Sequence, residues 1–246
     1  MLMAALMIVS TWAREGGDKL HFAFELTRHG ARAPTDSNEG YHVGPGMLTA
    51  SGMRQRYLLG AYNKKRFTET YKLLDLEDGP EEVLMMSTLV NRTMQSGYSE
   101  LMGMFQPNRN KSPKLTPDQM RALNLGGVAA PPFKVSKSND HLGDLPLPDG
   151  YVQMPIFNHE EKSLTDDLDL TGCDYVNAVD GARFFHDETY SDYSYLTDEL
   201  REPFKNAFNM TDEDAAKMDF LVSYGKSDIV QSNVFEGLGY GYDYTD

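Results

Sequence analysis

The chain contains two short segments whose apolar residues are arranged as in β-strands. In residues 21–27, Phe22, Phe24 and Leu26 occupy every second position. A period of two with aromatic residues predicts a strand that buries one face. The short apolar run in residues 82–86 is typical of a buried strand. Both segments lead into sequence that favours a helix.

The first predicted helix begins after a cap at Thr49 or Ser51 and runs to about Phe67. Inside it, Gly52 and Gly60 each cost about 1 kcal/mol relative to alanine in a helix interior. We expect these two glycines to permit close packing against a neighbouring element.

The second predicted helix begins after a cap at Ser87 or Thr88 and continues to about Met104. Strand, loop and helix therefore occur twice in succession. This order favours an α/β fold with a core of parallel strands flanked by helices.

The second half of the chain has a different pattern. Between Pro107 and Pro155, many Pro, Gly and Asn residues and little periodicity predict a long irregular connection. From Cys173 to Leu221, apolar residues return at helical spacing. The expected domains are an α/β core over residues 19–110, an irregular connection and mostly helical cap subdomain over residues 111–235, and a flexible tail over residues 236–246.

Composition narrows the class of function. The chain has 246 residues, with 23 Lys and Arg against 37 Asp and Glu, and a net charge of −14. This acidity argues against nucleic acid as a partner, because such binders need a basic face. A single cysteine, Cys173, excludes an internal disulfide framework and a multi-thiolate zinc site. No apolar run reaches the ~18–20 residues of a membrane-spanning helix, so we expect no stable membrane span.

The first residues resemble a secretory signal. Residues 1–13 are almost wholly apolar and end in small residues before the chain becomes polar, although the usual preceding basic stretch is missing. A buried first strand or helix is the alternative. Asn91 and Asn209 each begin a glycosylation triplet. We expect a secretory-pathway protein, lysosomal or extracellular, with Asn209 as the glycan acceptor.

The residues with the clearest chemistry follow the first predicted strand. The run Arg28-His29-Gly30-Ala31-Arg32-Ala33-Pro34 places two guanidinium groups beside an imidazole in a tight turn. Such crowded cationic groups repel one another unless an anion binds among them. Arginine suits phosphate because its planar fork donates two parallel hydrogen bonds. A neutral imidazole between the arginines can act as a nucleophile towards phosphorus.

Arg92 supplies a third arginine after the second predicted strand. It lies in the expected first turn of a helix, where free backbone N–H groups and the helix dipole also favour an anion. If the two strands are neighbours, Arg28, Arg32 and Arg92 can surround one phosphate group. A glycan on Asn91 would then block the site, so we expect Asn91 to be unmodified.

These motifs carry a resemblance to a known family. The chain resembles the histidine acid phosphatases, the branch of the histidine phosphatase superfamily that includes prostatic and lysosomal acid phosphatases. The motif R-H-G-x-R-x-P is complete at Arg28–Pro34, L-T-x-x-G-x-x-Q…L-G resembles residues 48–60, and the second arginine motif resembles residues 87–96. The resemblance is strong over residues 20–107 and faint beyond.

The resemblance implies a function and a mechanism. His29 would be the nucleophile, Arg28, Arg32 and Arg92 the phosphate ligands, and the reaction acid phosphatase hydrolysis of phosphomonoesters through a phosphohistidine. No metal or cofactor would be needed. The substrate class would be a small-molecule phosphomonoester, with free phosphate as the product. The fold would be a histidine phosphatase-like α/β core with an inserted helical subdomain.

The family's proton donor is the Asp of a late His-Asp pair that follows another sheet strand. His186-Asp187 matches the dipeptide, but it lies in a helical, charged stretch without a preceding run of β-branched residues. Asp187 is therefore either the donor or part of a solvated helix face. We expect the chain to stop before the true pair, the sheet to be incomplete, and phosphate binding and hydrolysis to be weak.

Three competing interpretations differ in class. Residues 167–171 match the D-x-D-x-T pattern of magnesium-dependent phosphatases with an Asp nucleophile, but no apolar strand precedes them. Cys173 lacks the arginine six positions later that a cysteine phosphatase requires, since Val179 stands there. A catalytically impaired pseudophosphatase would keep the arginines as a phosphate-binding or interaction module.

Overall fold

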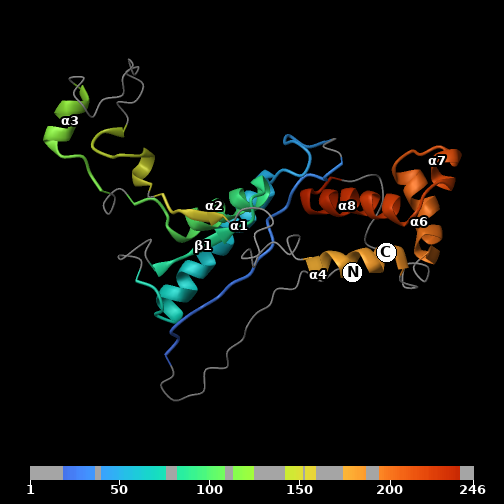
Figure 1. Ribbon diagram of the computed structural model, residues 1–246. Coiled ribbons are helices and arrows are strands. Elements are labelled where there is room, and N and C mark those ends of the chain that lie inside the picture. The colour runs from blue at the N-terminus through green and yellow to red at the C-terminus, as the bar shows by residue number, and fades with distance from the viewer. Residues whose placement is uncertain are drawn as a thin grey trace.

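The computed structural model describes residues 19–36, 40–75, 82–108, 113–124, 142–151, 153–158, 174–186 and 194–238 (Figure 1). The helices of these parts are α1 (Ala50–Lys65), α2 (Asn91–Met104), α3 (Pro117–Asn124), α4 (Asp174–His186), α6 (Ser194–Ala207), α7 (Asp212–Ala216) and α8 (Phe220–Glu236). Their strands are β1 (Met85–Ser87) and β2 (Ile156–Asn158). The fold is therefore mixed and rich in helix, with a small parallel sheet.

Both predicted helices of the first half are present. The side chain of Thr49 caps α1 by accepting a hydrogen bond from the backbone N–H of Gly52 at 3.1 Å, as the sequence predicts. A π-helical turn over Arg66–Thr70 extends α1 beyond Lys65. The predicted cap of the second helix at Ser87 or Thr88 is wrong: β1 runs through Ser87, and α2 begins later, at Asn91, with Val90 as an N-cap residue that makes no side-chain cap hydrogen bond.

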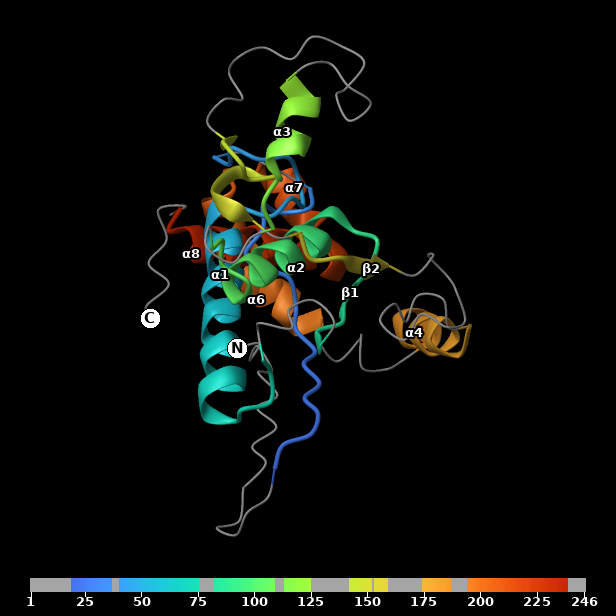
Figure 2. The same ribbon diagram turned by 90° about the vertical axis from the view of Figure 1, so that its left-hand side faces the viewer.

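Helices α1 and α2 pack side by side and form the centre of the first half (Figures 1 and 2). The contact depends on a glycine from each helix. A Cβ atom on Gly60 would clash with the carbonyl oxygen of Glu100, and one on Gly103 would clash with that of Tyr57. The expectation that Gly60 permits close packing is therefore confirmed.

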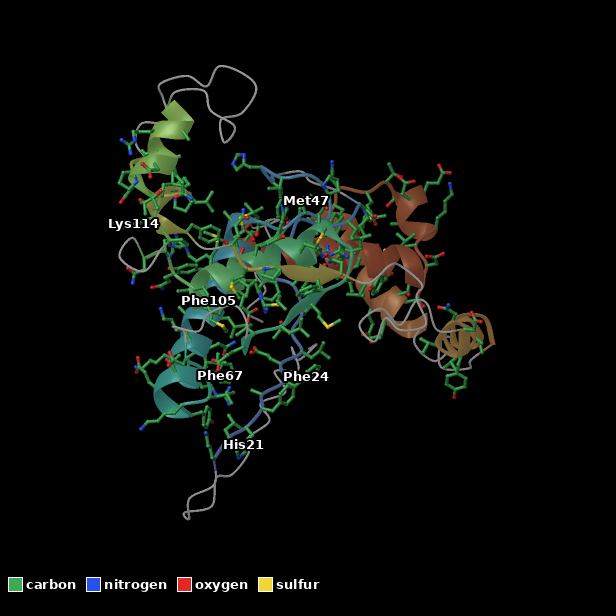
Figure 3. All side chains as sticks on the ribbon, turned by 60° about the vertical axis from the view of Figure 1, so that its left-hand side comes forward. His21, Phe24, Met47, Phe67, Phe105 and Lys114 are labelled. Carbon is green, nitrogen blue, oxygen red and sulfur yellow. The ribbon has the colours of Figure 1, made fainter. Side chains whose placement is uncertain are left out.

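The predicted strand over residues 21–27 is wrong. The segment makes no strand ladder with the described residues, and Phe22, Phe24 and Leu26 are 70–75% exposed. Figure 3 shows His21 and Phe24 along this segment, where it leads away from α2. Alternating apolar residues give a strand only when a neighbouring strand completes the hydrogen bonds, and β1 instead pairs with β2.

The predicted parallel pairing is confirmed, but with a different partner. Met85 pairs with Ile156 and Ser87 with Asn158 in a parallel register. The strand β2 follows directly after the segment for which the sequence predicts an irregular connection. The prediction that residues 82–86 form a buried strand is wrong in its burial, since Leu84 is 69% and Met86 37% exposed, and Phe157 of β2 is 51% exposed. The α3 helix and a short 3-10 turn also interrupt that connection.

Helices α6, α7 and α8 lie together in the second half, and α8 extends from this group towards α1 and α2 (Figure 1). Phe204 is buried in α6 and meets Phe208 edge to face, with ring centroids 5.7 Å apart. Gly237 ends α8 in the left-handed conformation, with φ of 67°. None of the described helices combines the length and apolarity that a bilayer crossing requires.

Candidate active site

Backbone hydrogen bonds, and not the strand that the sequence predicts before it, hold the turn that follows His29 in place. Arg32 and Leu48 form an isolated antiparallel bridge, and the N–H of Ala33 donates to the carbonyl of Met47 at 2.9 Å. The N–H of Thr49 donates to the carbonyl of Ala31 at 3.0 Å. These hydrogen bonds join the turn to Thr49, the N-cap residue of α1, and so fix the position of Arg32 relative to that helix.

Helices α1 and α2 both hold Gly30 and Ala31. The N–H of Gly30 donates to the hydroxyl of Ser96 in α2 at 3.1 Å, and the N–H of Ala31 donates to the side-chain oxygen of Gln55 in α1 at 2.9 Å. A Cβ on Gly30 would clash with the carbonyl of Gly52. A Cβ on Gly52 would in turn clash with the carbonyl of Ala31. Gly52 therefore permits close packing as expected, and glycine at position 30 is a steric requirement of this turn.

A buried network of polar side chains, centred on Arg56 and Glu100, holds the backbone that precedes His29. Arg56 donates to the carbonyl of Arg28 at 3.2 Å and to the hydroxyl of Thr27 at 2.6 Å, and it forms an ion pair with Glu100. Burial raises the pKa of Glu100, while the charge of Arg56 and a hydrogen bond from Asn63 oppose that rise. The carbonyl before His29 is thus tied to both helices.

His29 is partly buried and has a defined tautomer when its ring is neutral. Its Nδ1 lies 2.8 Å from the carbonyl oxygen of Gly30, and only an N–H can donate to that oxygen. The lone pair of the neutral ring is therefore on Nε2. The pKa of His29 is lowered to about 4, chiefly by burial; the positive charges of Arg28, Arg92 and Arg32 also lower it, while the contact with Gly30 opposes the shift.

The four predicted residues are brought together. Arg92 lies in the first turn of α2, as expected, and is partly buried. Burial lowers the pKa of Arg92, and the charges of Arg32 and Arg28 lower it further, while Asp228 opposes them. Since the same three arginines act on His29, three like charges and one imidazole share one small region. The arrangement does not depend on the predicted strand, because α1 and α2 hold the turn in its place.

Among the residues that the structure describes, two arginine donors in this region are buried without a partner. Neither Nε of Arg32 nor Nε of Arg92 makes a hydrogen bond to any described residue. Unpaired buried donors are costly in proteins. Together with the concentrated positive charge, they make the region suited to an anion with several acceptor oxygens. The described residues contain no group of three His, Cys, Asp or Glu side chains that could hold a metal ion.

Asp228 of α8 is a member of the site that the sequence did not suggest. Its carboxylate forms an ion pair with Arg32 at 2.7 Å. Burial acts to raise the pKa of Asp228, but hydrogen bonds from Arg32 and Thr35 outweigh burial and lower it. The two partners are 196 positions apart, and Asp228 belongs to no motif, so no signal in the sequence could have identified it.

Other predicted site residues lie outside the described residues. Asp187 is among them, and His186 is the last residue of α4. Residues 167–171 and Cys173, which carried the competing phosphatase interpretations, are outside as well. The role of each stays a prediction.

Comparison with known proteins identifies the family. The sequence matches the histidine phosphatase superfamily (branch 2) over residues 37–245. This range covers most of the chain. The chain belongs to the histidine phosphatase superfamily. The matched range contains Arg92 and Asp228 and begins after His29.

Several relatives in this superfamily are acid phosphatases. Human prostatic acid phosphatase is 35% identical over 96 residues, which are 36% of this chain and 24% of the relative. Putative acid phosphatase 10 of Caenorhabditis elegans is 28% identical over 142 residues, 54% of this chain and 34% of the relative. Human lysosomal acid phosphatase is 33% identical over 96 residues, 36% and 22% of the two chains. The chain therefore spans about a quarter to a third of the length of these relatives.

Proposed function

We propose that this histidine phosphatase hydrolyses phosphomonoesters at acid pH through a phosphohistidine on His29. The observation that carries the proposal is that the positive charges of Arg28, Arg32 and Arg92 act together on a partly buried imidazole whose pKa is lowered to about 4. Membership of the superfamily and the acid phosphatases among the relatives support it.

The first step is the transfer of the phosphoryl group to His29. The lone pair on Nε2 attacks phosphorus, the N–P bond forms, and the P–O bond to the leaving group breaks. Arg28, Arg32 and Arg92 neutralise the charge on the other phosphate oxygens, which lowers the barrier without a metal ion. The contact of Nδ1 with the carbonyl of Gly30 keeps the proton on Nδ1 and so leaves the lone pair on Nε2.

The pKa of His29 suits work at acid pH. With a pKa of about 4, the free enzyme keeps the ring neutral at pH 5, where an ordinary histidine is mostly protonated. In the second step, water attacks phosphorus, the N–P bond breaks, and inorganic phosphate leaves. The ring returns to its neutral state for the next substrate.

The leaving oxygen also needs a proton, which a general acid would supply. Asp187 remains a candidate for this donor. Asp228 is poorly suited, since its bonds to Arg32 and Thr35 lower its pKa and hold it ionised. If the donor is missing, release of an alkoxide slows by roughly 10²–10⁴-fold, whereas an acidic leaving group such as nitrophenolate is affected less.

The same proposal covers where the protein works. The apolar residues 1–13 and the two glycosylation triplets support a secretory-pathway location, and one of the relatives is named lysosomal acid phosphatase. Asn209 is exposed, which suits a glycan acceptor. The partner is a small-molecule phosphomonoester.

The test is hydrolysis of p-nitrophenyl phosphate at pH 5, with trapping of the phosphorylated protein. We expect the full chain to form a phosphohistidine detectable by mass spectrometry after a rapid quench at neutral to alkaline pH, and His29→Ala to form none. His21→Ala is the matched control, because His21 is exposed and lies on the segment that leads away from α2. A phosphorylated residue other than His29, or hydrolysis that survives His29→Ala, would overturn the proposal.

The experiment also separates an enzyme from a binding module. A protein that only binds phosphate would retain affinity for vanadate but would form no phosphohistidine. Turnover that survives Asp187→Asn but is lost in His29→Ala would show that a residue other than Asp187 supplies the proton.

A further inference from the structure

Asp228 and Arg32 meet in a defined two-point geometry. Nη1 of Arg32 donates to Oδ2 of Asp228 at 3.1 Å, and Nη2 donates to Oδ1 at 2.7 Å. Nη1 also donates to the carbonyl of Ala33 at 2.9 Å. The carboxylate thus binds the two terminal nitrogens of the guanidinium group. Both side chains are largely buried, at 12% exposure for Arg32 and 18% for Asp228.

These contacts leave one edge of Arg32 unused. A guanidinium has five N–H donors, and the two on Nη1 are taken by Asp228 and Ala33, while one on Nη2 is taken by Asp228. The second Nη2 donor and the Nε donor have no partner among the described residues, and they lie side by side on the edge of the group opposite Cδ. Nε is buried and makes no hydrogen bond to a described residue. Such an edge is a fork that fits two oxygens of a phosphate.

We propose that Asp228 is a positioning residue of the phosphate site, which holds Arg32 by its end so that the Nε–Nη2 edge faces the phosphate. The inference rests on the proposed function, because it assigns Arg32 to phosphate binding. Asp228 does not touch the ligand in this arrangement. It selects the orientation of Arg32 and offsets part of the repulsion among Arg28, Arg32 and Arg92.

Helix α8 is fixed firmly enough to serve this purpose. Asp228 also accepts from the backbone N–H of Thr35 at 3.2 Å. At the C-terminal end of the helix, Glu236 accepts hydrogen bonds from the hydroxyls of Thr49 at 2.5 Å and Ser51 at 2.9 Å. The helix is therefore tied to the loop that follows Arg32 and to the start of α1. The carboxylate of Asp228 therefore keeps a fixed position relative to Arg32.

A different role for the same contact makes the opposite prediction. If Asp228 were an internal anion that competes with phosphate for Arg32, its removal would free the arginine and strengthen phosphate binding. Removing a negative charge near the site would also favour an anion. A positioning role predicts weaker binding despite that change in charge, because Arg32 loses its fixed orientation.

The test measures the affinity of the full chain for inorganic phosphate and for vanadate by titration calorimetry. We expect Asp228→Asn to weaken both by about tenfold, the scale of one charge-assisted hydrogen bond. Asp228→Glu keeps the carboxylate and should retain most of the affinity. Glu213→Gln in α7 is the control, since it removes one negative charge from an exposed side chain of another helix, and its affinity should stay within about twofold.

A double-mutant comparison shows whether Asp228 acts through Arg32. In an Arg32→Ala background, Asp228→Asn should cause no further loss of phosphate affinity. A further loss in that background, or tighter binding in Asp228→Asn alone, would overturn the inference. So would an Asp228→Asn variant that folds, as judged by circular dichroism, and binds phosphate like the wild type.

The outcomes also separate this inference from the proposed function. If Arg32→Ala and Arg92→Ala leave phosphate affinity unchanged, the proposed phosphate site itself fails. If both weaken binding while Asp228→Asn does not, only the positioning role of Asp228 fails.

Discussion

The proposed mechanism requires His29 to supply a lone pair at acid pH, where an ordinary histidine is mostly protonated. Burial and the charges of Arg28, Arg92 and Arg32 solve this by disfavouring the protonated ring, which lowers its pKa to about 4. The arginines that would bind the phosphate thus also keep the proposed nucleophile neutral.

This dual role can be tested by titration of the imidazole. In phosphate-free buffer, NMR should give His29 a pKa of about 4. Arg92→Met should raise that pKa because it removes one positive charge, and the resonance is assigned by its loss in His29→Ala. A pKa of His29 near the ordinary value of ~6.5 in the wild type, or one unchanged in Arg92→Met, would contradict the account.

At the scale of elements, the pairing of α1 with α2 builds the site. Gly60 and Gly103 let the two backbones approach, and the ion pair of Arg56 with Glu100 joins them under the turn. Because Ser96 of α2 accepts a hydrogen bond from Gly30, a change in the spacing of the helices would move the residue next to His29. Stability and site geometry therefore depend on the same contact.

The sign of the change in the free energy of unfolding caused by Gly60→Ala tests this contact. Helix propensity alone would make the change stabilising by about 1 kcal/mol. We expect it to destabilise the protein by about 1–3 kcal/mol in urea unfolding, because the new Cβ clashes with the carbonyl of Glu100. Gly181→Ala in α4 is the control, since no atom of the described residues lies within 4 Å of its Cβ position, and it should follow propensity. A stabilising Gly60→Ala would disprove the close contact.

For the whole molecule, net charge and local charge have opposite signs. The chain carries −14 overall, yet Arg28, Arg32 and Arg92 act on one another and on His29. Asp228 offsets one of these charges, and its ion pair connects α8 of the second half to the turn of the first. Local potential rather than net charge governs which ligand is attracted to the site.

The depressed pKa of His29 also makes the stability of the whole chain depend on pH. The unfolded chain binds a proton at this histidine below about 6.5, while the folded chain does not until about 4. Its contribution to stability is therefore present above pH 6.5 and is lost as the pH falls towards 4. His29→Asn should lose less free energy of unfolding than the wild type between pH 7 and pH 4.5, measured by urea denaturation. An equal loss in both proteins would show that His29 titrates alike in the folded and unfolded chains.

Sequence patterns predicted the parts of the fold that local interactions decide. The cap at Thr49 followed from a residue type that favours that position, and Arg92 lies in the first turn of α2 as expected, although the helix begins after Val90 rather than after Ser87 or Thr88. The prediction of a strand over residues 21–27 was wrong, because a strand needs a partner strand that the sequence of the segment does not encode. The pairing of β1 with β2 joins segments far apart in the chain, and no local pattern contains that information.

The sequence by itself determined the chemistry of the site, because Arg28, His29 and Arg32 share one short turn and Arg92 starts a helix. The tertiary structure alone decided what surrounds them. It set the tautomer and low pKa of His29 through burial, and it brought Asp228 to the end of Arg32. Residue types fix which reactions are available, whereas burial and contacts between distant segments arise only when the helices pack.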